Sequence, residues 1–135
     1  MDVLLVEDEA LVREMLAEVL TDAGLDVAAT SSAEGALRVA GEAWDASQPP
    51  QVLVTDVDLG AGMDGVALVA EIRRRWPDLG VVVMTGRPSN LNGRDPDPDE
   101  ICLHKPFRPH RLTTAVQDLM RKSRSRTEAV RPPRE

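Results

Sequence analysis

The chain has 135 residues, which suits a single domain with a proper hydrophobic core. Its formal net charge is −7. Residues 1–120 hold 10 basic and 21 acidic side chains, a net of −11, so the body lacks the basic surface of a nucleic-acid-binding domain. The single cysteine, Cys102, excludes an internal disulfide and fits a reducing compartment. No apolar run is long enough to span a membrane and no basic region precedes the first one, so we expect a cytoplasmic protein.

The apolar residues predict strands and helices that alternate along the chain. Short continuous apolar runs are typical of strands buried on both faces of a parallel sheet. In chain order the predicted strands are 3–6, 25–30 (the weakest), 52–55, 81–84 and 101–103. Apolar residues at helical spacing predict helices that begin near residues 11, 32, 64 and 112. Gly24 suits the end of the first helix, Ser31 or Ser32 the cap of the second and Asp64 the cap of the third. This order favours an α/β fold, a doubly wound parallel sheet with right-handed crossovers.

The segment 86–100 breaks the alternation, because a helix should connect the last two strands there. It contains Pro88, Asn92-Gly93, Pro96 and Pro98, and prolines at this density prevent a continuous helix. It also offers no apolar stripe. We therefore expect a loop, with the fourth helix of the fold short or missing.

The end of the chain differs in charge from the rest. Residues 121–135 hold 6 basic and 2 acidic side chains, a net of +4, and include Pro132-Pro133. We predict one domain over 1–122, followed by a basic, disordered tail over 123–135.

Charged residues follow three of the predicted strands. Glu7 and Asp8 follow the first, Asp56 the third, and Lys105 comes shortly after the fifth. Ligand sites of parallel sheets lie at the carboxyl ends of the strands, so these side chains converge on one pocket if the strands are neighbours. Three carboxylates and an ammonium suit a hard divalent cation and a phosphoryl group.

Five motifs, taken together and in order, resemble the receiver domain of bacterial two-component response regulators over about residues 1–122. They are Val6-Glu7-Asp8-Glu9, Asp56 after a buried strand, Met63-Asp64-Gly65, Met84-Thr85-Gly86 and Lys105-Pro106-Phe107. The resemblance implies a flavodoxin-like fold whose five-stranded sheet has the order 2-1-3-4-5. It also implies Mg²⁺-dependent phosphorylation of an aspartate by a histidine kinase or phosphotransfer protein, with Mn²⁺ as a possible substitute.

Carried over residue by residue, the resemblance assigns a metal site to four residues. Asp8 and Asp56 resemble the family's direct Mg²⁺ ligands, and the backbone carbonyl of Asp58 resembles a third. Glu7 would act through a metal-bound water, because Mg²⁺ keeps part of its hydration shell.

The resemblance also assigns roles in phosphorylation. Asp56 resembles the phosphoacceptor, Lys105 the cation that pairs with a phosphoryl oxygen, and Thr85 the hydroxyl that bonds another oxygen. The family has a cis peptide bond at the position of Lys105–Pro106, which would aim the ammonium into the pocket.

The chain departs from the family in three places. Glycine-rich residues 59–62 replace the proline-containing loop after Asp56, and the segment 86–100 lacks a credible helix. Cys102 stands where the family carries its switch aromatic. The phosphorylation chemistry therefore looks intact, whereas the parts that usually transmit the signal do not.

The resemblance implies a receiver that accepts a phosphoryl group on Asp56, and we expect it to be stand-alone, because only residues 123–135 remain after the predicted domain. It would signal by binding an unidentified downstream protein when phosphorylated, or by passing the phosphoryl group along a relay. We expect no direct DNA binding and no enzymatic activity beyond self-phosphorylation from a donor and autodephosphorylation. Because the first strand begins almost at Met1, the chain can also be a piece of a longer protein.

Two alternatives remain open at this point. Asp56-Val57-Asp58 matches the Asp-x-Asp motif of haloacid-dehalogenase-like phosphatases, although that motif normally ends the first strand rather than the third. A receiver-like module that binds partners without phosphorylation is the other. Its usual sign is loss of the acidic pair, the aspartate or the lysine, and none is lost here.

Overall fold

The computed structural model describes residues 1–60, 62–86 and 99–130, with side chains up to residue 122. Strands and helices alternate as predicted over the first 85 residues. The elements are β1 (Val3–Val6), α1 (Ala10–Asp22), β2 (Val27–Thr30), α2 (Ala33–Asp45), β3 (Val52–Asp56), α3 (Gly65–Arg75), β4 (Gly80–Thr85), β5 (Glu100–His104) and α4 (Pro109–Val130).

The strands form one five-stranded parallel sheet in the order β2-β1-β3-β4-β5. Every residue of β1, β3 and β4 is buried, which explains why these strands read as continuous apolar runs. β2 and β5 lie at the edges and are partly exposed. The predicted α/β doubly wound fold and its strand order are confirmed.

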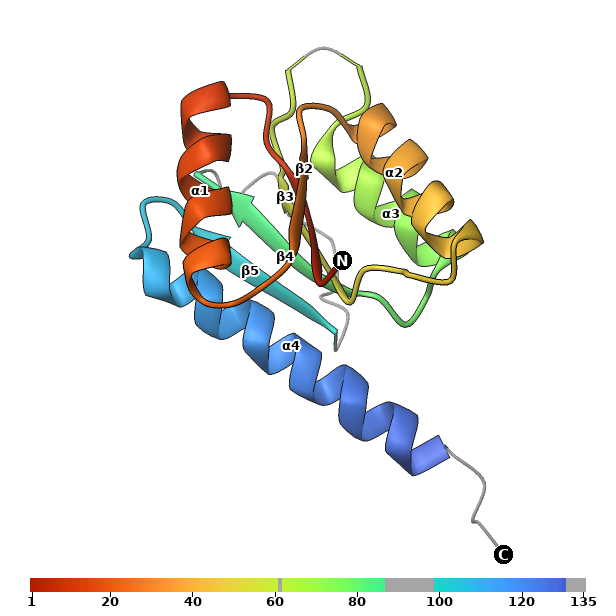
Figure 1. Ribbon diagram of the computed structural model, residues 1–135. Helices are drawn as coiled ribbons and strands as arrows, with labels where there is room; N and C mark the ends of the chain where they lie inside the picture. Colours follow the sequence, from red (N-terminus) through yellow and green to blue (C-terminus); the bar gives the residue numbers. More distant parts are fainter. Residues whose placement is uncertain (61, 87–98, 131–135) are drawn as a thin grey trace, which may run out of the picture.

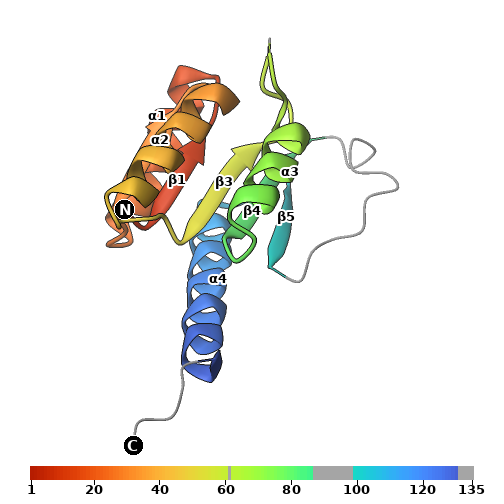
Figure 2. The same ribbon diagram turned by 90° about the vertical axis from the view of Figure 1, so that its right-hand side faces the viewer.

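Two apolar layers cover the sheet, one on each face. Helices α1 and α4 pack on one face and α2 and α3 on the other, as Figure 1 and Figure 2 show. Alternate residues of β1 point into different layers, with Val3 and Leu5 in the first and Leu4 and Val6 in the second. Because the central strands β1, β3 and β4 are parallel neighbours, their carboxyl ends lie together at one end of the sheet.

The predicted helix caps agree with the structure. The Ser32 hydroxyl accepts a hydrogen bond from Gly35 N at 3.0 Å, and Asp64 Oδ1 accepts one from Ala67 N at 2.8 Å. Gly24 follows α1 with a φ of +88°, a conformation that favours glycine.

The C-terminal helix corrects the predicted tail. α4 continues to Val130 (Figure 1), beyond the predicted domain boundary at residue 122. The stretch 110–131 contains no glycine or proline, so a helix that starts on the sheet can propagate through it despite its basic composition. Residues 131–135 lie outside the described part of the chain.

The fourth helix along the described chain, α4, follows β5 and corresponds to the last predicted helix, near residue 112. The predicted loop between β4 and β5, with its short or missing helix, falls on residues 87–98, which lie outside the described residues. Across the ranges that are described, no helix has the length and apolar character that crossing a bilayer requires.

The two tryptophans pack against each other at the end of the sheet where the strands begin. Trp44 of α2 and Trp76 at the end of α3 stack with ring centroids 4.5 Å apart and planes 18° apart. They line a hollow with Gln51 and Leu79, which lie just ahead of β3 and β4. The stack thus joins α2 to α3 at the end of the molecule opposite the predicted site.

Candidate functional site

Three of the predicted site residues meet at the end of the sheet where the strands have their carboxyl ends. Lys105, just after β5, donates a hydrogen bond from Nζ to Asp56 Oδ2 at the end of β3. The same Nζ lies 3.8 Å from Oε1 of Glu7, which follows β1. The predicted convergence of these strand ends is therefore confirmed in the geometry.

Main-chain bonds between neighbouring strands hold these side chains in place. Lys105 N donates to the Thr85 carbonyl at 2.8 Å, and Val57 N donates to the Met84 carbonyl at 3.0 Å. Asp58 N donates to Asp56 Oδ1 at 3.0 Å, so the Asp56 carboxylate is fixed at both oxygens. The Lys105–Pro106 peptide bond is cis, as the resemblance implied.

Gly65 brings the start of α3 against the backbone of Asp56. A Cβ atom on Gly65 would come 2.0 Å from the Asp56 carbonyl oxygen, and Gly65 N donates to the Val57 carbonyl at 2.9 Å. Only a residue without a side chain allows this approach. The glycine of the Met63-Asp64-Gly65 motif is thus explained by close packing of α3 against the backbone of Asp56.

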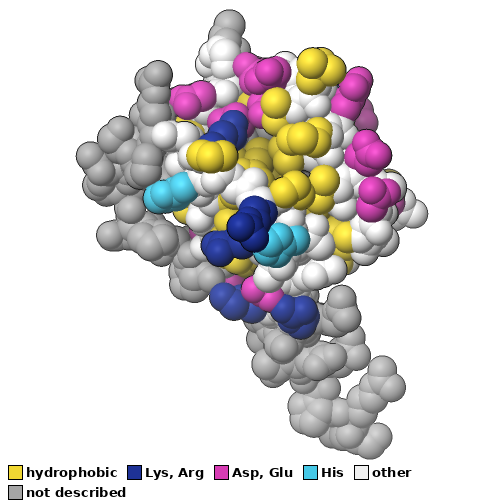
Figure 3. Space-filling view, turned by 90° about the vertical axis from the view of Figure 1, so that its left-hand side faces the viewer, with side chains coloured by type: hydrophobic (Ala, Val, Ile, Leu, Met, Phe, Trp, Pro, Cys, Tyr) yellow, Lys and Arg dark blue, Asp and Glu magenta, His cyan; other side chains and the backbone are white. Residues whose placement is uncertain are grey.

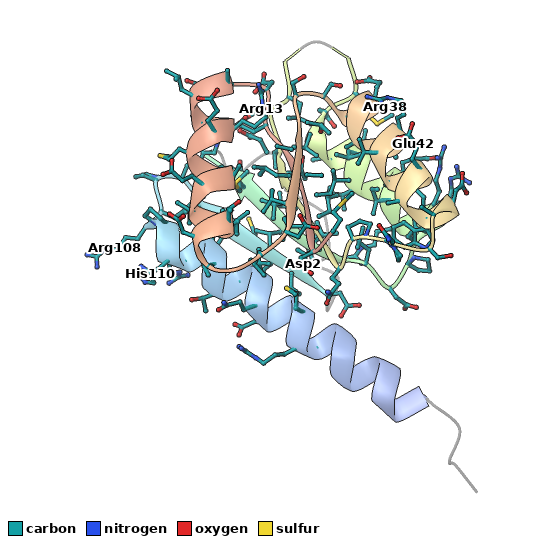
Figure 4. The ribbon with its side chains drawn as sticks, in the orientation of Figure 1. Asp2, Arg13, Arg38, Glu42, Arg108 and His110 are labelled. Carbon is teal, nitrogen blue, oxygen red and sulfur yellow. The ribbon has the colours of Figure 1, made fainter. Side chains whose placement is uncertain are left out.

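Glu7 is almost completely buried, and Oε2 has no hydrogen-bond partner among the described atoms. Burial, followed by the negative charge of Asp56, raises the pKa of Glu7 to about 7, although Lys105 acts in the opposite direction. Arg13 of α1 (Figure 4) donates from Nη1 to the Glu7 carbonyl at 2.9 Å, which fixes the backbone here.

Lys105 stays protonated in this pocket. Partial burial lowers its pKa, but the hydrogen bond to Asp56 and the charges of Asp56, Glu7 and Asp58 outweigh burial and raise that pKa. The ammonium thus balances part of the negative charge that the carboxylates place at this edge.

Asp8 lies beside the glycine-rich loop that connects β3 to α3. Asp8 is exposed, and a Cβ on Gly60 would come 3.0 Å from its Oδ2. Gly60 also has a φ of +45°, which favours glycine. Asp8 therefore lies against the β3–α3 loop at Gly60.

The site offers the carboxylate oxygens that a hard cation prefers. The described side chains are not, however, arranged around one common point. Over the described ranges, no group of three or more His, Cys, Asp and Glu side chains has a metal-binding arrangement. Lys105 pairs with Asp56 instead. The unpartnered, buried Glu7 Oε2 beside Asp56 is nevertheless the kind of atom that an additional cation or its water would satisfy.

Thr85 and Cys102 lie on the adjoining strands β4 and β5. Thr85 is the last residue of β4 and is fully buried, and it pairs in register with His104. Cys102 is exposed on β5. Cys102 pairs in register with Val83, so the position for which the resemblance predicts a switch aromatic carries a small thiol.

Glu34 is a site neighbour that sequence reasoning missed. Its Oε2 accepts a hydrogen bond from Met63 N at 3.1 Å, across 29 positions of sequence. The sequence marks Glu34 only as part of a helix start, because no local pattern signals so distant a contact.

Known proteins share both the sequence pattern and the fold. A family model described as the response regulator receiver domain matches residues 3–117. The transcriptional regulatory protein AruR of Pseudomonas aeruginosa is 30% identical over 136 residues, which cover 98% of this chain and 54% of AruR. The response regulator protein FleR of the same species is 43% identical over 84 residues, 62% of this chain and 16% of FleR. This chain thus spans about half of AruR and a small part of FleR.

Solved structures give the same result. A response regulator receiver protein from Sinorhizobium medicae has a TM-score of 0.76 at 30% identity, over 91% of this chain and 96% of that one. The receiver domain of NtrX from Brucella abortus has a TM-score of 0.75 at 28% identity, over 89% of this chain and 98% of that one.

Proposed function

The chain belongs to the response regulator receiver domain family, and on this basis we propose that Asp56 is its phosphoacceptor. The observation that carries the proposal is the fixed carboxylate of Asp56. Asp58 N–H holds one oxygen and the Lys105 ammonium holds the other, at the carboxyl end of the sheet. A carboxylate is a weak nucleophile, so fixed orientation and neutralised charge are what the site has to supply.

In the proposed reaction, an Asp56 oxygen attacks the phosphorus of a phosphohistidine on a histidine kinase or phosphotransfer protein. The new O–P bond forms as the P–N bond breaks, and the imidazole leaves with the donor. Lys105 can move its hydrogen bond from Asp56 to a phosphoryl oxygen, because its side chain is only partly buried. The Thr85 hydroxyl, at the end of the adjoining strand, would bond another phosphoryl oxygen.

Mg²⁺, or Mn²⁺ in its place, would be held by Asp8, Asp56 and the backbone carbonyl of Asp58, with Glu7 acting through water. When bound, the cation neutralises charge on the phosphoryl oxygens. The support in this chain is the set of oxygen donors and the unpartnered Oε2 of Glu7. Asp8 is exposed and can turn toward the pocket without a change in the core.

An apolar groove beside the pocket is the proposed place where the phosphodonor protein docks. The groove has a volume of about 510 Å³. It is lined by Glu9, Val12, Met15, Leu16, Lys105, Pro106, Phe107 and Pro109. Figure 3 shows hydrophobic side chains gathered on this face, and Leu11 and Met15 are 77% and 51% exposed. Exposed apolar groups next to Lys105 would place a partner's reactive histidine near Asp56.

The phosphorylated chain would then signal by binding a downstream protein or by passing the phosphoryl group on in a relay. Of the two alternatives, the phosphatase is not supported, because the Asp-x-Asp motif begins at the last residue of β3 and the family model is that of a receiver. The second alternative, a receiver-like module that binds partners without phosphorylation, is tested by the following experiment.

The test is incubation of the purified chain with acetyl phosphate and Mg²⁺, followed by mass spectrometry. We expect one acid-labile phosphoryl group on the wild type and none on Asp56→Asn. Asp45→Asn, at the end of α2, is the matched control and should be labelled normally. Labelling that persists in Asp56→Asn would place the phosphoacceptor elsewhere, and an unlabelled wild type would favour the non-phosphorylated binding module.

A further inference from the structure

Glu34 occupies space that a side chain at position 62 would need. Its carboxylate accepts the hydrogen bond from Met63 N, and a Cβ on Gly62 would come 3.0 Å from Glu34 Oε2. Gly62 has a φ of +93°, which favours glycine as well. Glycine at position 62 therefore leaves the room that the Glu34 carboxylate of α2 occupies.

The helix that carries Glu34 is well anchored at this end. Ser32 caps α2 through Gly35 N, and Ala33 and Ala36 are buried in the layer between α2 and the sheet. The Met63 N–H, followed by the backbone N–H of Glu34 itself, lowers the pKa of Glu34. A charged acceptor on a fixed helix start can therefore hold the loop in one conformation.

The other glycine of the same loop meets a second carboxylate. A Cβ atom on Gly60 would lie 3.0 Å from Asp8 Oδ2. The described residues of the loop thus lie between Asp8 on one side and Glu34 on the other. At the start of this loop, Asp58 N–H reaches Asp56 Oδ1.

We propose that Glu34 is a positioning residue for the phosphoryl site. By holding Met63 N–H it fixes the β3–α3 loop in the conformation in which Asp58 offers its N–H to Asp56 and its carbonyl to a cation. Glu34 touches neither the phosphoryl group nor the metal and acts only through the loop. The inference rests on the proposed roles of Asp56 and Asp58.

The test compares three variants on α2 by the Mg²⁺ dependence of labelling with acetyl phosphate. Glu34→Ala removes the acceptor, whereas Glu34→Gln keeps an amide oxygen that can accept from Met63 N–H. Glu42→Ala is the matched control, because Glu42 pairs with Arg38 on the outer face of α2 (Figure 4). Each variant is also unfolded thermally, so that a loss of stability is measured separately.

Losing one charge-assisted hydrogen bond should raise the half-saturating Mg²⁺ concentration of Glu34→Ala about fivefold. The labelling rate at saturating Mg²⁺ should change much less, because the cation then holds the loop itself. Glu34→Gln should recover most of the affinity, and Glu42→Ala should match the wild type. A purely structural role would lower the unfolding temperature and leave the half-saturation unchanged.

Asp56→Asn in the same assay separates the two possible failures. If it is still labelled, or if the wild type is not labelled, the proposed function fails. If Asp56→Asn is silent and the wild type is labelled, an unchanged Mg²⁺ half-saturation in Glu34→Ala overturns the role of Glu34 alone.

Discussion

Gly65 lies so close to Asp56 that a Cβ on Gly65 would be 2.0 Å from the Asp56 carbonyl oxygen. Gly65→Ala must therefore displace either the start of α3 or the backbone that carries the phosphoacceptor. We expect a loss of about 1–3 kcal/mol in the free energy of unfolding, typical of an overpacked site. We also expect slower labelling by acetyl phosphate. Urea denaturation and the labelling rate measure the two effects.

Gly41→Ala is the control for that substitution. Gly41 lies inside α2, and a Cβ there would meet nothing within 4 Å. Alanine should raise the free energy of unfolding by about 0.5–1 kcal/mol, because it has the higher helix propensity. Equal effects of the two substitutions would show that the backbone around Asp56 can accommodate a Cβ atom at position 65.

The raised pKa of Glu7 predicts a pH dependence in the metal-free protein. This pKa is about 7 in the folded chain against an ordinary value of 4.5, so the folded state holds the proton more tightly. The resulting stability is fully present below pH 4.5 and is lost as the pH rises through 7. Glu7→Gln should remove this decline and be the more stable protein at pH 8. Urea midpoints at pH 5 and pH 8 with a chelator test this, and parallel pH curves for the two proteins would refute it.

Much of the fold follows from the sequence because burial on both faces leaves a clear signal. β1, β3 and β4 were predicted to within a residue at each end from apolar runs alone. β5 is longer than predicted, because pairing with β4 brings in Glu100 and His104, whose side chains give no strand signal. The helix beyond residue 122 is not predicted from the sequence, because a basic composition is also typical of disordered segments.

The candidate site was predictable where it depends on topology and not where it depends on side-chain contacts. Strand ends brought Glu7, Asp56 and Lys105 together as expected, while their roles stay predictions. The contact of Glu34 with the loop joins two segments that carry no shared pattern. The choice of Asp56 rather than Glu7 as the hydrogen-bond partner of Lys105 depends on side-chain positions, which spacing along the chain does not encode.

Lys105→Ala should destabilise the metal-free protein at pH 8. Lys105 contacts Asp56 and lies near Glu7, so its removal leaves two buried carboxylates without a cation. Because the lysine side chain is 35% exposed, solvent screening limits the loss to about 1 kcal/mol. The loss should shrink at pH 5, where Glu7 is protonated. Lys122→Ala, at an exposed position of α4, should change the urea midpoint little at either pH.

Mg²⁺ should raise the unfolding temperature of the wild type and not that of Asp8→Asn. A ligand that binds only the folded state at 10 times its dissociation constant adds about 1.4 kcal/mol to the free energy of unfolding. Asp22→Asn, an exposed change at the end of α1, should keep the response. Thermal scans with MgCl₂ and with NaCl of equal ionic strength measure this, and an unchanged Mg²⁺ response in Asp8→Asn would remove that residue from the metal site.

The stack of Trp44 on Trp76 gives the protein an internal optical reporter. These are the only two tryptophans of the chain, there is no tyrosine, and both lie at the amino edge of the sheet, away from Asp56. Their emission therefore follows the contact between α2 and α3 and is not quenched directly by chemistry at the carboxyl edge. A change in tryptophan fluorescence when Asp56 is phosphorylated would mean that movement has travelled the length of the strands.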